Sequence, residues 1–148
     1  VETPGQKTDQ YYALAQRLLK RGVPLNGIGF EDHMDITHSY PPVQMTATMQ
    51  RFARLGVQVQ ITEADVQLQN SHASTQEKLK RQAQIYTSLV HSCQAVSQCN
   101  AITIWGFTDR YTWIPEYTHH ADQPLIFDTQ YRPKPAYNAI RDAFLHKQ

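Results

Sequence analysis

The chain has 148 residues, which is the usual size of one domain. Its 41% hydrophobic and 18% charged residues are typical of a folded chain and exclude disorder as the main state. The 14 basic and 13 acidic side chains form no basic field that would favour nucleic acid or an anionic membrane surface. The apolar runs are far shorter than the roughly 20 residues of a membrane span, and no leader sequence follows Val1. We therefore expect a soluble chain whose first residue is not a native start.

Apolar spacing predicts three helix–strand pairs and a final helix. In chain order these are a helix over 8–21, a strand over 27–30, a helix opened by Pro41 and Pro42, a strand over 57–61, a helix from Ser74, a strand over 101–107 and a helix near Pro135. The third strand is almost continuously apolar, so we expect it to be buried. The last helix is expected to turn one face inward, with Ala136, Ile140, Ala143 and Phe144.

This alternation of helices and strands predicts an α/β fold with parallel strands, either a doubly wound sheet or a (β/α)8 barrel. No glycine-rich phosphate loop follows any of the strands, which disfavours a nucleotide-binding sheet. Acidic residues, histidine or tryptophan follow the strands instead. Because the active sites of barrel enzymes lie at the carboxyl ends of the strands, this pattern favours the barrel.

Two acidic residues, Glu63 and Asp65, follow the strand over 57–61. A period of two places both on the inward face of that strand unless a bulge intervenes, whereas both would be solvated if the strand had already ended. His33 follows the preceding strand in the same way, although a lone histidine is more often a core or surface group. In adjacent barrel strands, we expect His33 to bond Glu63 while Asp65 orients the ring, which would hold Glu63 ionised.

Two tryptophans accompany the last strand. Flat aromatic faces beside carboxylates suit sugar rings, whose C–H faces stack on indole while their hydroxyls bond to acids. Trp105 is equally well explained by core packing. Trp113 lies in a polar loop with Tyr111 and Tyr117 nearby, so core packing explains it less well.

The two cysteines, Cys93 and Cys99, are too isolated for a four-ligand zinc site and lack the spacing of a redox pair. A short structural disulfide is expected, with two buried free thiols as the alternative. A disulfide would indicate an oxidising compartment, outside the cytosol.

Two further groups contain residue types that bind metals: His33, Asp35 and His38, and His119, His120 and Asp122. Neither has the spacing of a helical His-Glu-x-x-His site or of a zinc finger, so both are interpreted as loop surface and no metal site is predicted. No Gly-x-Ser-x-Gly elbow is present to indicate a serine nucleophile.

Several segments form a specific pattern when they are taken together and in order. They are GVPLNGIGF at 22–30 leading to His33, ITEADV at 61–66, Cys93 with Cys99, IWGFTD at 104–109 with WIP at 113–115, and YRPKPAY at 131–137. Through them nearly the whole chain resembles the C-terminal part of glycoside hydrolase family 10, whose members are mostly endo-1,4-β-xylanases. The resemblance implies a (β/α)8 TIM barrel of which this chain covers only strands six to eight and their helices, without an internal domain boundary. Since such barrels have roughly 250 residues or more, the chain is then a little over half of one domain.

The resemblance also implies hydrolysis of β-1,4-xylan with retention, by double displacement and without a metal or organic cofactor. Glu63 would be the nucleophile, supported by His33 and Asp65, and Trp105 and Trp113 would form the sugar platform. Cys93 and Cys99 match a disulfide of many members, which favours a secreted protein.

Two features depart from the family pattern. Retaining hydrolysis needs a second carboxylic acid about 5 to 5.5 Å from the nucleophile, which the family carries in an Asn-Glu pair after the fourth barrel strand. The sequence contains no Asn-Glu pair, so we expect the acid/base upstream of Val1 and an inactive chain on its own. Glu31, at a substrate-binding position, replaces the glutamine usual in the family and adds negative charge beside the nucleophile.

The leading hypothesis is therefore a secreted xylanase that binds xylan or xylo-oligosaccharides and neither nucleic acid nor a membrane. The main alternative is a non-catalytic β-glycan-binding module that keeps Trp105 and Trp113, and a weaker one is a metal-dependent barrel hydrolase using His33, Asp35 and His38. The open sheet edges predict self-association or pairing with a complementary N-terminal half of the barrel.

Overall fold

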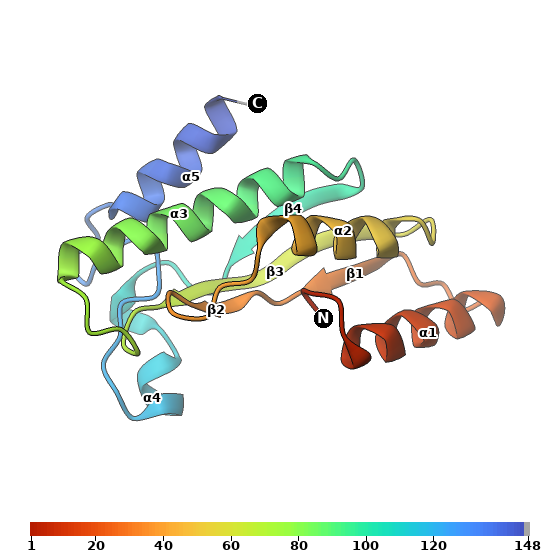
Figure 1. Ribbon diagram of the computed structural model, residues 1–148, viewed down its shortest axis with the longest axis horizontal. Coiled ribbons are helices and arrows are strands. Elements are labelled where there is room, and N and C mark those ends of the chain that lie inside the picture. Colours follow the sequence, from red (N-terminus) through yellow and green to blue (C-terminus); the bar gives the residue numbers. More distant parts are fainter. Residues whose placement is uncertain (147–148) are drawn as a thin grey trace.

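The computed structural model describes residues 1–146 (Figure 1). The strands are β1 (Gly27–Phe30), β2 (His33–Asp35), β3 (Gln58–Gln67) and β4 (Cys99–Ile104). The helices are α1 (Gln6–Lys20), α2 (Pro42–Ala53), α3 (Thr75–Gln94), the 3₁₀ helix η1 (Asp109–Tyr111), α4 (Ile114–Thr118) and α5 (Pro135–Leu145). The predicted alternation is confirmed, and the short helices η1 and α4 lie in what was expected to be a loop.

The sheet is parallel throughout, as predicted, and β3 is its central strand. β1 and then β2 pair with one side of β3, and β4 pairs with the other. β2 was not predicted, because the strand over 27–30 was expected to end in the polar residues Glu31, Asp32 and His33. Asp32, with a φ of 62°, interrupts the edge strand, and pairing resumes with His33 opposite Asp65. Aspartate is one of the few residues that adopt this left-handed conformation readily.

β3 contains an extra residue in its middle. Phe30 pairs with Ile61 and His33 pairs with Asp65, so three steps along the edge strands match four steps along β3. The register against β4 shifts in the same stretch. Such a β-bulge increases the local twist and reorients side chains. The expected strict alternation therefore fails beyond Ile61, where Asp65 is buried together with both its neighbours while Glu63 is half-exposed.

Helices α2 and α3 cover one face of the sheet, and α5 lies beside α3 (Figure 1). Met45, Met49 and Phe52 recur at helical spacing on α2, and all three are fully buried. Ser74 accepts a hydrogen bond from the backbone N–H of Glu77, which begins α3 as predicted. The core between the layers also includes Phe30, Val59, Ile61, Val66, Tyr86 and Leu89.

Two predictions near the C-terminus are wrong. β4 ends at Ile104 rather than at Phe107, and it is only partly buried because no strand pairs with its outer side among residues 1–146. Phe144 is not buried: it is 49% exposed, whereas α5 packs on the core through Ala136 and Ile140. Within the same residues, no helix has the length and hydropathy of a membrane span.

Candidate active site

His33 lies between two carboxylates of the central strand. Its Nε2 is 3.3 Å from Glu63 Oε2, within hydrogen-bond distance, and its Nδ1 is 3.0 Å from Asp65 Oδ2, within ion-pair distance but too far off direction for a hydrogen bond. The parallel register sets His33 opposite Asp65, and Glu63 lies in the bulged stretch of β3 beside the same ring. The predicted meeting of these three side chains is confirmed.

This arrangement changes the electrostatics of the imidazole. The contact with Asp65 raises the pKa of His33 above its ordinary value, the contact with Glu63 raises it further, and burial of the ring opposes both. The raised pKa favours a protonated imidazole between the two carboxylates.

Trp113 completes the surroundings of His33 and Asp65. Its Nε1 donates a 2.8 Å hydrogen bond to Oδ2 of Asp65, whose side chain is fully buried. Its ring meets His33 edge-on, with centroids 5.1 Å apart, and packs against Tyr117 at the same distance. Because Trp113 is half-buried, it belongs to the surface of the site and not to the core.

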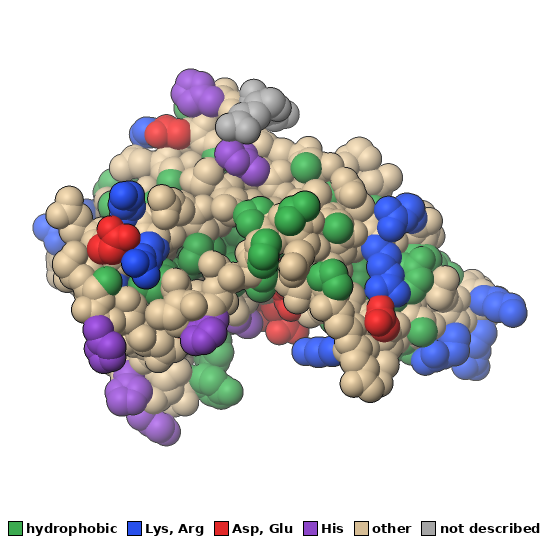
Figure 2. Space-filling view, in the orientation of Figure 1, with side chains coloured by type: hydrophobic (Ala, Val, Ile, Leu, Met, Phe, Trp, Pro, Cys, Tyr) green, Lys and Arg blue, Asp and Glu red, His purple; other side chains and the backbone are tan. Residues whose placement is uncertain are grey.

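Trp105 and Glu31 lie beside this cluster on neighbouring strand ends. The backbone N–H of Trp105 donates to the Ala64 carbonyl at 3.0 Å, and its ring is 46% exposed, which excludes the core alternative. The Glu31 carbonyl accepts from the Glu63 N–H at 3.1 Å, and its exposed side chain lines a cavity of about 280 Å³ with His33. In Figure 2 the surface is hollowed between the parts that hold α1 and α4, and acidic side chains are visible in the hollow.

Asp32 and Tyr40 were missed by the sequence analysis. Asp32 is 1% exposed, its Oδ1 accepts the Tyr40 hydroxyl, and its Oδ2 is buried without a hydrogen-bond partner in residues 1–146. Burial raises the pKa of Asp32 to about 7, although the Tyr40 hydrogen bond lowers it. The acidic pair before His33 was visible in the sequence, but nothing distinguished its buried member.

Of the residues considered as metal ligands, Asp35 and Asp122 form hydrogen bonds with neighbouring segments, whereas His33 belongs to the cluster described above. Asp35 accepts hydrogen bonds from Thr37 and Asn70, and Asp122 accepts from the Leu68 N–H at 2.9 Å. His119 and His120 are exposed. The part of the chain that the structure describes contains no cluster of three or more side chains placed to hold a metal ion.

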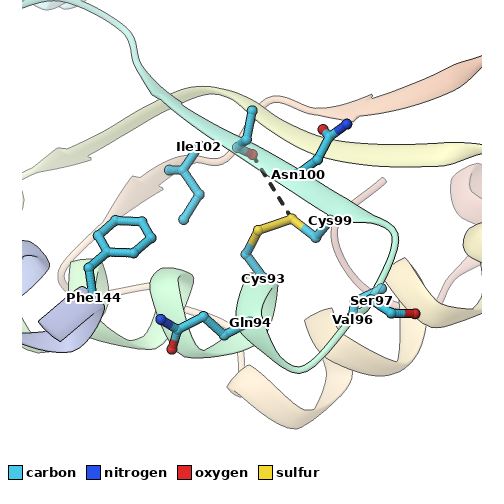
Figure 3. A pocket seen from close by; sticks show the side chains of 9 residues that line it. Cys93, Gln94, Val96, Ser97, Cys99, Asn100, Ile102 and Phe144 are labelled. Atoms are coloured by element: carbon cyan, nitrogen blue, oxygen red, sulfur yellow. Dashed lines mark hydrogen bonds between the residues drawn. A yellow bond between two sulfur atoms is a disulfide. The ribbon is translucent and has the colours of Figure 1, made fainter. Parts of the chain in front are cut away.

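The two cysteines form a disulfide, so the free-thiol alternative is wrong. The bond joins Cys93, near the end of α3, to Cys99, at the start of β4, with the two Cα atoms 5.2 Å apart (Figure 3).

Comparisons with known proteins show what the whole chain resembles. The chain is 34% identical to endo-1,4-beta-xylanase 5 of Pyricularia oryzae over 140 residues, covering 95% of this chain and 34% of the relative. It is 36% identical to endo-1,4-beta-xylanase B of Thermotoga neapolitana, covering 99% and 42%. The structure superimposes on xylanase 10B of Thermotoga petrophila RKU-1, solved in complex with xylobiose, with a TM-score of 0.92 and 36% identity, covering 97% and 43%.

The chain thus spans less than half the length of each of these proteins. Its parallel sheet is part of an α/β fold, and these structural neighbours imply the (β/α)8 barrel. The glycosyl hydrolase family 10 model matches residues 1–143. The chain therefore belongs to glycosyl hydrolase family 10.

Proposed function

We propose that this chain is the C-terminal part of a retaining endo-1,4-β-xylanase, and that all 148 residues belong to a single catalytic barrel. In this proposal β1 with β2 is barrel strand six, β3 is strand seven and β4 is strand eight. One observation carries the proposal: His33 lies between Glu63 and Asp65 at the carboxyl ends of parallel strands, where barrel enzymes hold their active sites.

The reaction would proceed by double displacement. The Glu63 carboxylate attacks the anomeric carbon and forms a glycosyl ester, while a general acid protonates the departing glycosidic oxygen. The same group then takes a proton from water, which attacks the anomeric carbon and releases Glu63. We expect this acid/base in the upstream half of the barrel, so the chain alone would be inactive. The mechanism uses no metal or organic cofactor.

The other site residues would support this step and bind substrate. His33 would orient Glu63 through their 3.3 Å contact, and Asp65 would hold His33 in place. Trp105 and Trp113 offer aromatic faces to sugar rings. Glu31 would contact the substrate and add charge beside Glu63.

The proposed ligand is xylan or a xylo-oligosaccharide, in line with the xylobiose in the Thermotoga petrophila structure. The near-neutral charge balance gives no reason to add nucleic acid or a membrane surface as a partner. The Cys93–Cys99 disulfide supports secretion, because disulfides persist in oxidising compartments.

The outer edge of β4 is a natural place for further barrel strands. A partly apolar pocket of about 570 Å³ lies beside it, lined by the disulfide, Ile102 and Phe144 among others (Figure 3). We propose that a complementary N-terminal half of the barrel covers this edge, and that the separate chain self-associates through it. The non-catalytic glycan-binding module is not favoured, since the relatives named above are xylanases.

The nucleophile can be tested in the xylan-cleaving enzyme that contains this chain. Glu63→Ala should lower the rate of xylan cleavage by several orders of magnitude without changing the melting temperature by more than a few degrees. Added azide should restore turnover and give the glycosyl azide of inverted configuration, because it fills the space of the lost carboxylate. Glu77→Ala, at an exposed position on α3, is the matched control. A Glu63→Ala variant with near wild-type rate would refute the assignment, and a wild-type protein that binds xylohexaose without cleaving it would favour the binding module.

A further inference from the structure

The loop that carries Trp113, residues 105–134, is closed at its base by a buried ion pair. Asp109, which begins η1, and Lys134, which precedes α5, are 2.9 Å apart from Oδ2 to Nζ. Their side chains are only 1% and 6% exposed. The pair therefore joins the two ends of the loop out of contact with water.

Each polar side-chain atom of this pair has a hydrogen-bond partner. Lys134 Nζ also donates to the Gln123 carbonyl at 2.7 Å and to the Leu125 carbonyl at 2.6 Å, which with Asp109 accounts for all three donors. Asp109 Oδ1 accepts from the Leu125 N–H at 2.8 Å. Burial lowers the pKa of Lys134 and raises the pKa of Asp109, so the pair depends on these contacts to stay charged.

Separate hydrogen bonds attach the loop to the strand that carries Asp65. Residue Pro124 accepts hydrogen bonds from the Val66 N–H at 3.1 Å and from the Tyr86 hydroxyl at 2.8 Å. The buried amide of Gln82 bridges the carbonyls of Val66 and Gln123. The segment 123–125 is therefore fixed to β3 at Val66, the residue after Asp65, and Lys134 and Asp109 bind the same segment.

A buried ion pair contributes little net stability compared with well-packed apolar residues. The role of this pair is therefore better explained by the loop conformation that it fixes. We infer that Asp109 and Lys134 are positioning residues that hold Trp113 against Asp65 and His33. They thereby set the binding of the sugar that stacks on Trp113, a consequence that rests on the proposed function. The positioning itself does not depend on it.

The positioning can be measured on the 148-residue chain. Trp105 and Trp113 give the two indole N–H signals, which the Trp113→Phe variant assigns. In the neutral pair Asp109→Asn with Lys134→Met, the Trp113 indole N–H should exchange with solvent at least about tenfold faster, because its bond to Asp65 opens more often. The Trp105 signal is the internal reference. Arg132→Met, which removes the exposed pair with Asp128 in the same loop, should leave both signals unchanged.

Unchanged protection of Trp113 in a folded neutral-pair variant overturns the inference. If the variant does not fold, the wild-type chain supplies the test. There, the Trp113 indole N–H and the Leu125 amide, which is bonded to Asp109, should show the same opening free energy and the same urea dependence. Independent opening of the two groups also overturns the inference.

In the enzyme that contains this chain, the neutral pair should raise KM for xylo-oligosaccharides about tenfold or more, with a smaller change in kcat. An equal loss in kcat with unchanged KM contradicts a role in sugar binding. A wild-type enzyme without turnover refutes the proposed function alone, because the exchange measurement still reports on the ion pair.

Discussion

The indole nitrogen of Trp113 donates a 2.8 Å hydrogen bond to the buried carboxylate of Asp65. The same oxygen lies 3.0 Å from Nδ1 of His33, so one atom contacts both the Trp113 indole and the imidazole beside Glu63. Asp65 therefore links the parts of the site that would bind substrate and perform chemistry.

Replacing Asp65 by asparagine should lower the pKa of His33, because the Asp65 contact is the main cause of its raised value. A raised histidine pKa stabilises the fold fully below about 6.5, and this contribution is lost as the pH rises through the folded-state value. In Asp65→Asn the unfolding free energy that is lost as the pH rises should be smaller. Titration of the His33 ring signals by NMR measures the change. Asp35→Asn is the control, and an unchanged pKa in Asp65→Asn would contradict the prediction.

The buried Asp32 predicts a second pH dependence. Its pKa is raised from 3.8 to about 7, so the folded chain binds more protons than the unfolded chain between these values. The unfolding free energy should therefore fall as the pH rises from about 4 to about 7. Urea unfolding of the wild type and of Asp32→Asn across this range should show a weaker fall in the variant. Equal slopes for the two proteins would rule out Asp32 as the source.

Tyr40 donates the hydrogen bond that Asp32 accepts, so Tyr40→Phe leaves that buried oxygen without its partner. We expect a loss of about 1 to 3 kcal/mol in unfolding free energy at pH 7. Tyr11→Phe, at an exposed position on α1, is the control and should be neutral. Equal stability of the two variants in urea would disprove a contribution of the Asp32–Tyr40 bond.

The disulfide should stabilise the chain by constraining the unfolded state. Closing the short loop between Cys93 and Cys99 corresponds to about 2 kcal/mol. The double variant Cys93→Ser with Cys99→Ser should lose this amount in urea unfolding, and a reducing agent should destabilise the wild type but not the variant. Unchanged stability of the wild type after complete reduction would exclude the effect.

Gly106 follows β4 with a φ of 133°, and a Cβ there would lie 2.8 Å from Leu125 Cδ1. Gly106→Ala should therefore cost about 1 to 3 kcal/mol and displace the segment that Lys134 binds. Gly5 has no neighbour within 4 Å of a Cβ, which makes Gly5→Ala a suitable control. Thermal unfolding of both variants measures the difference, and a melting temperature for Gly106→Ala at or above the wild-type value would refute the prediction.

Much of the fold was predictable because helix faces and strand ends are local patterns. Apolar spacing predicted a helix opened by Pro41 and Pro42, and the structure forms α2 there. The end of β4 was not predictable, because apolar residues such as Trp105 and Phe107 occur both in buried strands and in aromatic loops. The burial of Phe144 was predicted wrongly for a related reason, because it depends on which residues pack against α5.

The site was predictable where it depends on strand ends and not where it depends on unusual backbone or distant pairing. His33, Glu63 and Asp65 each follow an apolar strand, so parallel pairing brings them together. The burial of Asp32 depends on a left-handed turn in an edge strand. Asp109 and Lys134 are 25 residues apart and joined by a loop, with no repeat that relates them.

The extra residue in β3 divides the strand into two stretches with different roles. Before it, Val59 and Ile61 fill the hydrophobic core, and their pairing with β1 sets the register of the sheet. After it, the alternation of side chains along β3 is shifted by one residue, and the carboxylates of Glu63 and Asp65 lie beside His33. We expect that deleting Thr62 would restore one regular alternation of side chains along β3. Glu63 would then move away from the imidazole, although every hydrophobic residue of the strand would remain.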